Sequence, residues 1–234
     1  MAYDLDILLP VYNEAKSIAS FIESIDKSIK KKIKYRFLIC EDGSTDGTKD
    51  VLKKIRKKFK ISLITETRRK GFSKAVQDGI KKSTAKYLLI MDSDGQCDHK
   101  KILSLWYYKS NFDLINAYRI KRVDFAYRRV YSQVCYIIYK ILFSVPLRDP
   151  SFGFIMMNKK VYKSLDDYKI LCPDGFFWEF NARAKIKGYT FKEIPIFHKK
   201  RKFGNTKIYT YFNLPKIALT HLIGLLKIKF SKDV

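Results

Sequence analysis

The chain has 234 residues, 47% hydrophobic and 15% aromatic, which excludes intrinsic disorder and fits one domain with a sizeable core. Lys and Arg number 48 against 23 Asp and Glu, and the net charge of +25 indicates a polyanionic partner: nucleic acid, an anionic membrane surface or a phosphorylated substrate. The four cysteines lack the paired spacing of a zinc site, and the N-terminal apolar run has no basic head. We therefore expect a reducing, cytoplasmic setting and no signal peptide.

The first ninety or so residues alternate short apolar runs with helical patterns. Continuous apolar runs predict strands buried on both faces, and apolar residues at helical spacing predict the helices between them. The expected strands span 5–12, 35–42, 61–66 and 87–92, and the expected helices span 18–29, 51–59 and 72–83. This order predicts an α/β fold with a mostly parallel, Rossmann-like sheet and helices on both of its faces.

The second half of the chain is less regular. Its patterns predict strands over 112–119, 151–157 and 189–197, helices over 127–143 and 175–188, and a basic tract over 198–207. No run reaches the roughly 18 apolar residues that a membrane-spanning helix needs. We therefore expect one main domain over 1–210, followed by an amphipathic, membrane-associating segment over 211–234.

Polar clusters follow three of the expected strands, in "PVYNE", "EDGSTDG" and "DSDGQ". Ligands of open parallel sheets bind beyond the carboxyl ends of the strands. Asp92 and Asp94 stand one residue apart after a buried run, where two carboxylates repel each other unless a divalent cation joins them. We expect Mg²⁺ or Mn²⁺ on Asp92 and Asp94, with Gln96 as a further oxygen ligand and substrate phosphates completing the shell.

Other nucleotide-binding signals are absent from the sequence. There is no G-x-G-x-x-G after the first strand and no G-x-x-x-x-G-K-[ST], and the three histidines show no metal or nucleophile spacing. Structural interpretations stay open for several residues, because Pro10 can end a strand and Asp42 can serve turn chemistry.

Five segments in chain order resemble the family-2 inverting glycosyltransferases of GT-A fold. They are "LPVYNEAKSI", "EDGSTDGT", "RKGFSKAVQDGI", "MDSDGQ" and "DPSFGF", and the resemblance covers roughly residues 4 to 210. Within the family the chain is similar to the dolichyl- and polyprenyl-phosphate sugar synthases. The segment "EIPIFHKKRKFGNTK" resembles their late E-V-P-x-x-F…R-x-x-G-x-S-K pattern, with Thr206 in place of the usual serine.

This resemblance implies a role for each matching residue. The nucleotide pocket would be formed by Pro10, Tyr12, Glu14 and Asp42, and the metal would be held by Asp92, Asp94 and Gln96. The acceptor phosphate would lie near Arg128 and Ser132, a cation near the sugar or phosphates would be Arg119, and the diphosphate would be covered by Arg201 and Lys207. From these roles the residues expected to act in catalysis are Asp94, Arg119, Arg128, Arg201 and Lys207. Glu179 is added to them as a residue that could bind the donor sugar, with a buried network as its structural alternative.

The implied reaction moves a sugar from a nucleotide-diphosphate sugar to a polyprenyl or dolichyl monophosphate with inversion. A phosphate is already anionic at pH 7 and needs positioning more than a base. The alternative acceptor is a glycan hydroxyl in cell-surface polysaccharide or lipopolysaccharide synthesis, which would need a base such as Asp174 or Glu179.

A polyprenyl phosphate lives in an anionic membrane leaflet, which accounts for the charge of the chain. We expect peripheral association with the cytoplasmic face through the aromatic helix 127–143, Phe143 included, and through the C-terminal segment, alone or with a membrane-anchoring partner protein. A nucleic-acid-binding module is the remote alternative, and no recognised motif supports it.

Overall fold

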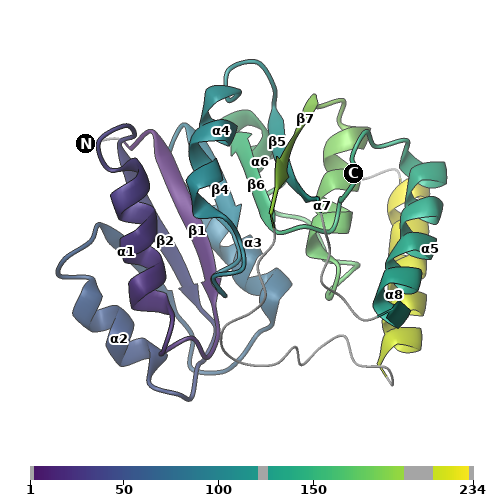
Figure 1. Ribbon diagram of the computed structural model, residues 1–234. Helices are drawn as coiled ribbons and strands as arrows, with labels where there is room; N and C mark the ends of the chain where they lie inside the picture. Colours follow the sequence, from purple (N-terminus) through teal and green to yellow (C-terminus); the bar gives the residue numbers. More distant parts are fainter. Residues whose placement is uncertain (1–2, 121–125, 198–212, 232–234) are drawn as a thin grey trace.

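The computed structural model describes residues 3–120, 126–197 and 213–231, and the side chains of α5 (Ala126–Phe143) from residue 131 onward. One sheet of seven strands forms the centre of this described part, with helices on both sides (Figure 1). The strands are β1 (Leu5–Val11), β2 (Tyr35–Glu41), β3 (Ile61–Thr65), β4 (Tyr87–Met91), β5 (Leu114–Arg119), β6 (Phe154–Asn158) and β7 (Phe191–Ile196).

The strand order is β3-β2-β1-β4-β6-β5-β7. Neighbouring strands are parallel except at β6, which runs antiparallel to both β4 and β5. All seven residues of β1 are buried, as expected of a central strand covered on both faces. The mostly parallel α/β sheet predicted from the sequence is therefore confirmed.

The helices divide between the two faces of the sheet and a lateral layer. Besides α5 they are α1 (Ile18–Ile29), α2 (Thr48–Ile55), α3 (Phe72–Lys82), the 3₁₀ helix η1 (His99–Lys101), α4 (Ile102–Tyr107), α6 (Lys159–Ser164), α7 (Phe176–Ile186) and α8 (Leu214–Phe230). One buried cluster joins the sheet to α1, α2 and α4, and a second joins the other face to α3, α6 and α7. A third cluster packs α5 and α8 against α7, at the side of the molecule (Figure 1).

The sequence predicted the long helices correctly and missed the short ones. Helix α1 buries the five positions expected from its apolar spacing, whereas η1, α4 and α6 were not predicted. Helix α8 is less one-sided than an amphipathic helix, because apolar residues lie on both its inner and its outer face. Phe143 is a correction too, because it is only 6% exposed and packs 5.2 Å from the ring of Tyr139, so it does not face outward.

Helix α8 contacts α5 and α7 and shares their buried cluster, so the described part of the C-terminal segment packs onto the main domain. The expected domain boundary near residue 210 lies outside the described residues. Within the described part of the chain, no helix is long and apolar enough to cross a membrane.

Candidate functional site

Three parallel strands end side by side and define one edge of the sheet, here called the site rim. Strand β1 lies between β2 and β4, so their last residues Val11, Glu41 and Met91 bring their following loops together. The Ser93 hydroxyl donates to the Pro10 carbonyl over 2.7 Å, which ties the loop after β4 to the end of β1. The predicted residues Pro10 and Asp92 therefore belong to one rim.

The loops after β1 and β2 hold each other in place. The Asn13 amide donates to the Ser44 hydroxyl over 2.9 Å, and the Thr45 amide donates to the Asn13 side-chain oxygen over 2.9 Å. The Glu14 amide donates to Thr48 Oγ1 over 2.9 Å. The Glu14 carboxylate is nearly buried and accepts a hydrogen bond from the Ser17 hydroxyl, so it lies at the start of α1. This interlocking fixes the backbone on both sides of Tyr12.

Asp42 organises the loop that precedes α3. Its Oδ1 accepts from the Lys70 amide over 2.6 Å and its Oδ2 accepts from the Gly71 amide over 2.9 Å. The neighbouring Gly43 has φ +70°, and a Cβ there would meet backbone atoms of Arg68 and Arg69 at 2.7 Å. Asp42 thus performs the turn chemistry that the sequence left as its alternative role, at the same rim as Tyr12.

Arg69 was missed by the sequence analysis, although it begins the quoted "RKGFSKAVQDGI" segment. Its guanidinium carbon lies 4.2 Å from the centre of the Tyr12 ring, and its Nε lies 3.9 Å from Asp42 Oδ2. An aromatic ring, a guanidinium and a carboxylate therefore meet at the rim, a set suited to stacking on a base and to accepting hydrogen bonds from a nucleoside.

Asp92 is pressed against the backbone of Gly153. The Asp92 amide donates to the Gly153 carbonyl over 3.1 Å, and a Cβ at Gly153 would lie 2.7 Å from both carboxylate oxygens of Asp92. The same Cβ would lie 2.8 Å from Phe177. A side chain at position 153 would force Asp92 or Phe177 to shift, which gives a reason for the glycine in "DPSFGF".

Asp94 lies beside Asp92 and folds onto its own turn. Its Oδ1 accepts from the Gln96 amide over 3.0 Å. Burial raises the pKa of the Cys97 thiol well above its usual value, and the negative charges of Asp92 and Asp94 raise it further. Both carboxylates therefore act on one buried side chain, as expected of neighbours at the end of β4.

The two carboxylates meet part of the requirement for a divalent metal. Carboxylate oxygens are the ligands that Mg²⁺ and Mn²⁺ prefer. Among the described residues no group of three or more His, Cys, Asp or Glu side chains is placed to hold an ion. The donor set therefore fits a cation that takes its remaining ligands from substrate phosphates and water, and does not fit an all-protein cage.

Arg119, at the end of β5, is engaged with an acidic partner. Its Nε and Nη2 donate to the two carboxylate oxygens of Asp149 over 2.6 and 2.9 Å, and Nη2 also donates to the Ser151 hydroxyl over 3.2 Å. The guanidinium lies 4.9 Å from the Phe152 ring centre. The charge of Arg119 also lowers the pKa of the Cys97 thiol, which the charges of Asp92 and Asp94 raise. Part of the positive charge of Arg119 is therefore already balanced by its ion pair with Asp149.

Glu179 lies in the interior and not at an open position of the site. Its side chain is fully buried and one oxygen accepts from the Leu171 and Cys172 amides over 2.8 and 2.7 Å. The other oxygen accepts from Arg183 Nε and Nη2 over 3.0 and 2.9 Å. With four donors bound, Glu179 satisfies a buried network, which was its structural alternative. The i, i+4 spacing of Glu179 and Arg183 was the available signal.

The remaining predicted residues are placed as follows. Asp174 is exposed just before α7, and its charge raises the pKa of His221, although burial lowers that pKa more strongly. Ser132 lies half-buried on α5. The side chain of Arg128, and Arg201 and Lys207 entirely, lie outside the described residues.

The sequence and the fold match known proteins. A profile described as "Glycosyl transferase family 2" matches residues 6–166. The chain is 24% identical over 215 residues to a dolichol-phosphate mannosyltransferase of Pyrococcus furiosus, an alignment that covers 87% of this chain and 59% of that relative. The chain therefore spans little more than half the length of that relative.

Two solved structures show the same fold at low sequence identity. A glucosyl-3-phosphoglycerate synthase of Mycobacterium tuberculosis, in complex with Mn²⁺, UDP and phosphoglyceric acid, aligns with a TM-score of 0.73 at 13% identity over 99% of this chain and 80% of its own. The mannosyltransferase PcManGT of Pyrobaculum calidifontis, in complex with GDP-Man and Mn²⁺, aligns with a TM-score of 0.62 at 16% identity over 98% of this chain and 73% of its own. Together with the profile match, these alignments show that the chain belongs to glycosyl transferase family 2 and has its glycosyltransferase domain in the GT-A fold.

Proposed function

We propose that this chain transfers a sugar from a nucleotide-diphosphate sugar with help from a divalent cation at Asp92 and Asp94. The observation that carries the proposal is that the Asp92 carboxylate packs against the backbone of Gly153, next to Asp94. Both carboxylates lie at the same rim as Tyr12, Asp42 and Arg69. The solved mannosyltransferase and phosphoglycerate synthase complexes, which contain Mn²⁺ with GDP-Man or UDP, support the choice of ligands.

The rim supplies separate groups for each part of the donor. Tyr12 and Arg69 would stack on the base, and the Asp42 carboxylate would accept hydrogen bonds from the nucleoside. A bound Mg²⁺ or Mn²⁺ would supply Lewis-acid neutralisation of the leaving diphosphate, with Asp92 and Asp94 as its protein ligands. We propose that Arg119 lies near the sugar or the phosphates of the donor, and that Arg201 and Lys207 cover the diphosphate.

The reaction itself is a displacement at the anomeric carbon. An acceptor oxygen forms the new bond from one face while the bond to the diphosphate oxygen breaks on the other. The bonding electron pair leaves with the nucleoside diphosphate, and the configuration inverts. The residues of the rim position these partners and stabilise the leaving charge.

A polyprenyl or dolichyl monophosphate is the acceptor we favour. The dolichol-phosphate mannosyltransferase relative supports it. The burial of Glu179 also supports it, because a phosphate nucleophile is already anionic and needs no base from the protein. We place the acceptor phosphate at Arg128 and Ser132 on α5. A hydroxyl acceptor would leave the exposed Asp174 as the candidate base, since the oxygens of Glu179 are occupied.

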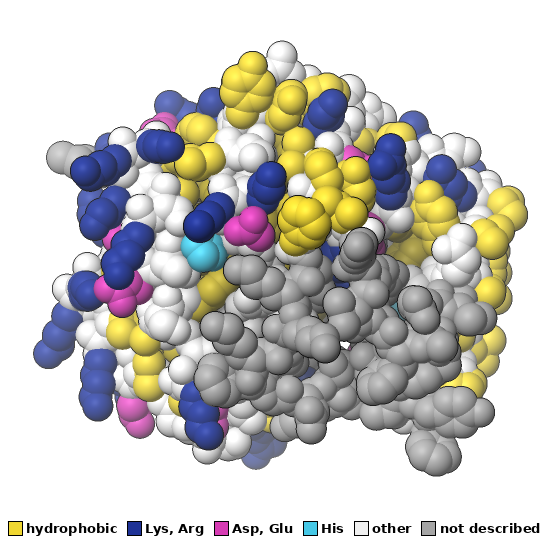
Figure 2. Space-filling view, viewed as in Figure 1, with side chains coloured by type: hydrophobic (Ala, Val, Ile, Leu, Met, Phe, Trp, Pro, Cys, Tyr) yellow, Lys and Arg dark blue, Asp and Glu magenta, His cyan; other side chains and the backbone are white. Residues whose placement is uncertain are grey.

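The outer faces of α5 and α8 support binding at the cytoplasmic face of a membrane. Apolar side chains lie exposed at helical spacing on both: Val134, Ile137 and Ile141 on α5, and Leu219, Ile223, Leu226 and Phe230 on α8. Figure 2 shows hydrophobic side chains along the edge that these helices form, whereas Lys and Arg are spread over the visible face. Apolar side chains would enter the lipid interface and the surrounding cations would attract anionic headgroups.

The donor chemistry is tested with a panel of nucleotide sugars, Mn²⁺ or Mg²⁺ and a polyprenyl phosphate, with release of nucleoside diphosphate as the readout. We expect Asp92→Asn and Asp94→Asn each to abolish release, and the exposed Asp50→Asn on α2 to leave it unchanged. Undiminished release from both site variants would refute the metal proposal. Loss of turnover in Asp174→Asn, with donor binding retained, would point to a hydroxyl acceptor.

Membrane binding is tested by flotation with vesicles rich in anionic lipid. Ile141→Asp with Phe230→Asp should lower the bound fraction, because both side chains are over 75% exposed on the proposed face. Tyr107→Asp, at a 75% exposed position on α4, is the matched control. Equal binding of all three proteins would count against this face.

A further inference from the structure

His221 is a buried titratable residue of α8 to which the proposed reaction gives no role. The residue is 4% exposed, and its Nδ1 lies 3.2 Å from the Tyr131 hydroxyl of α5. The other ring nitrogen, Nε2, is buried and has no hydrogen-bond partner in the part of the chain that the structure describes. A buried polar atom without a partner is costly, so this nitrogen indicates that a bound group supplies the missing contact.

The Nε2 edge of the imidazole faces the start of α7. A Cβ at Gly175, the residue just before this helix, would lie 2.6 Å from Nε2, so the absence of a side chain at Gly175 lets the ring approach the helix end. The first amides of a helix have no partner within the helix, and glycine has no side chain with which to cap them. The N-terminus of α7 therefore presents hydrogen-bond donors and a positive partial charge beside Nε2.

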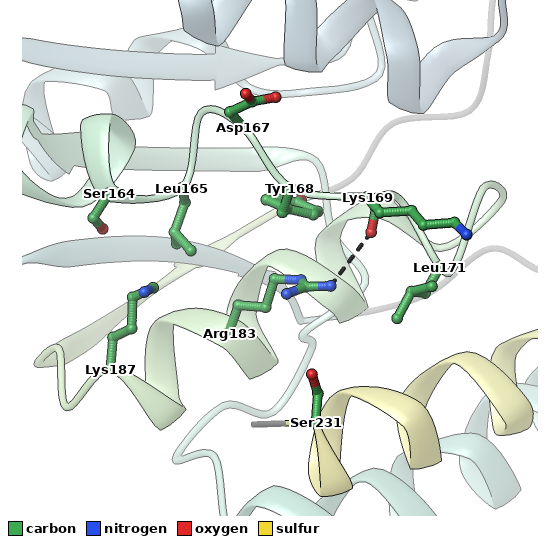
Figure 3. A pocket seen from close by; sticks show the side chains of 9 residues that line it. All are labelled: Ser164, Leu165, Asp167, Tyr168, Lys169, Leu171, Arg183, Lys187 and Ser231. Atoms are coloured by element: carbon green, nitrogen blue, oxygen red, sulfur yellow. Dashed lines mark hydrogen bonds between the residues drawn. The ribbon is translucent and has the colours of Figure 1, made fainter. Parts of the chain in front are cut away.

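The C-terminal half of α7 differs from its start, because the cation there is already paired. A pocket of about 530 Å³ lies at that end, and Arg183 reaches it from α7 (Figure 3). The guanidinium donates to a Glu179 oxygen over 2.9 Å and to the Lys169 carbonyl over 3.4 Å. The charge of Arg183 is thus balanced within the chain, and the start of α7 is the end at which a ligand would satisfy a buried atom.

The start of α7 is close to both the site rim and the proposed acceptor position. A Cβ at Gly153 would lie 2.8 Å from Phe177, in the first turn of α7, and 2.7 Å from the Asp92 carboxylate. On the other side, Tyr131 connects the imidazole to α5, and the next residue of α5 is Ser132, where we place the acceptor phosphate. The imidazole therefore lies where an acceptor bound to α5 would approach the donor.

The protonation of the imidazole suits an anionic ligand. We assign the Tyr131 hydroxyl as the donor to Nδ1, which places the proton of the neutral ring on Nε2. Burial lowers the pKa of His221, and the exposed Asp174 raises it. A bound anion would also raise this pKa, so binding of the anion and protonation of the ring favour each other. A donor nitrogen beside a helix N-terminus is a combination that binds oxyanions.

We infer that His221 binds the acceptor, with Nε2 donating a hydrogen bond to an oxygen of a phosphate monoester at the N-terminus of α7. This inference rests on the proposed lipid-phosphate acceptor and adds α7 and α8 to α5 as the elements that hold it. A phosphate monoester has three terminal oxygens. One would contact Nε2, a second would contact Ser132, and the third would attack the anomeric carbon, so that His221 orients the nucleophile without taking its proton.

The test is calorimetric titration of the full chain with farnesyl phosphate, in EDTA so that no metal draws the phosphate to the site rim. Farnesol has the same hydrocarbon chain without the phosphate and should bind at least about tenfold more weakly. His221→Leu removes the Nε2 donor at similar volume and should weaken farnesyl phosphate binding by at least about tenfold. His221→Gln restores an N–H donor and should bind within about threefold of the parent.

The matched control is Leu225→Val, one turn further along the same buried side of α8, which should bind within about twofold of the parent. Equal binding by the parent and His221→Leu would overturn the inference and leave the lipid-phosphate acceptor in place. Equal weakening in His221→Gln or in Leu225→Val would also overturn it, because packing and not the donor would then be responsible. Thermal unfolding checks that each variant is folded.

Failure of the acceptor proposal itself would look different. The parent chain would then bind farnesyl phosphate no more tightly than farnesol, and both the lipid-phosphate acceptor and the role of His221 would be refuted. Binding of a nucleoside diphosphate with Mn²⁺ is measured separately, so the donor part of the proposed function is judged independently of this result.

Discussion

Replacing Gly153 by alanine should displace the Asp92 carboxylate, and a suitable control can distinguish this effect from a general loss of stability. The added Cβ would lie 2.7 Å from both Asp92 oxygens and 2.8 Å from Phe177. Each oxygen would then be about 0.7 Å closer than ordinary van der Waals contact allows, so the carboxylate must turn or shift by a comparable distance. Because a displacement of about 1 Å can cost about 100-fold in rate, we expect a loss of roughly 10- to 100-fold.

The assay is nucleoside diphosphate release, together with Mn²⁺ titration in the presence of donor. Overpacking alone should also lower the free energy of unfolding by about 1 to 3 kcal/mol, so a control must share that effect. Gly79→Ala provides it, because its Cβ would lie 2.0 Å from Leu8 Cδ1, on α3 and away from Asp92. Gly79→Ala should lose stability and keep its Mn²⁺ affinity. Parental metal affinity and rate in Gly153→Ala would refute the reasoning.

Three further predictions follow from individual side chains. Glu179→Gln leaves the buried Arg183 charge without its charged partner and should lower the free energy of unfolding by roughly 3 kcal/mol in urea titrations. The kcat of the folded fraction should stay within about threefold of the parent value. A kcat loss of about 1,000-fold with unchanged stability would indicate that Glu179 acts in catalysis. Arg69→Ala should raise KM for the donor about two- to fivefold with kcat unchanged, since an exposed stacking contact with Tyr12 is lost; a fall in kcat alone would contradict the assignment to base binding. Burial lowers the pKa of His221 below 6.5, so the unfolded chain binds more protons there and the free energy of unfolding should fall as pH drops through 6.5 toward the folded-state pKa. Denaturant titrations from pH 7.5 to 5.5 should show a smaller decrease in His221→Asn, and parallel curves would show that His221 is not responsible.

Much of the fold was predictable because the apolar spacing within each strand and within the helix that follows it is a local property of the sequence. The buried positions of α1 follow directly from residue spacing, and the strand β1 follows from a short run that is apolar except for Asp6. Helices η1, α4 and α6 are too short for a periodic pattern to register, and their positions depend on tertiary packing.

The candidate site was predictable as a set of motifs and only partly as a set of contacts. Asp92 and Asp94 could be predicted because they directly follow a buried strand, which is a local sequence signal. The pairing of Arg119 with Asp149 and the contact of Arg69 with Tyr12 join residues 30 or more positions apart, and no spacing rule predicts them. For Glu179 the i, i+4 spacing to Arg183 was the only sequence signal of an ion pair, and the structure adds that the pair is buried.

The reversed direction of β6 has a consequence for tolerance to insertion. In a parallel strand the residues that follow it reach the site rim, but β6 is antiparallel, so the residues before it, such as Gly153, arrive there. Asn158, which ends β6, pairs with Tyr87 at the start of β4 and leads to the far edge. Residues inserted around 158–160 should therefore leave the position of the Asp92 carboxylate unchanged, whereas even one residue inserted within 149–153 should displace Gly153 and with it this carboxylate.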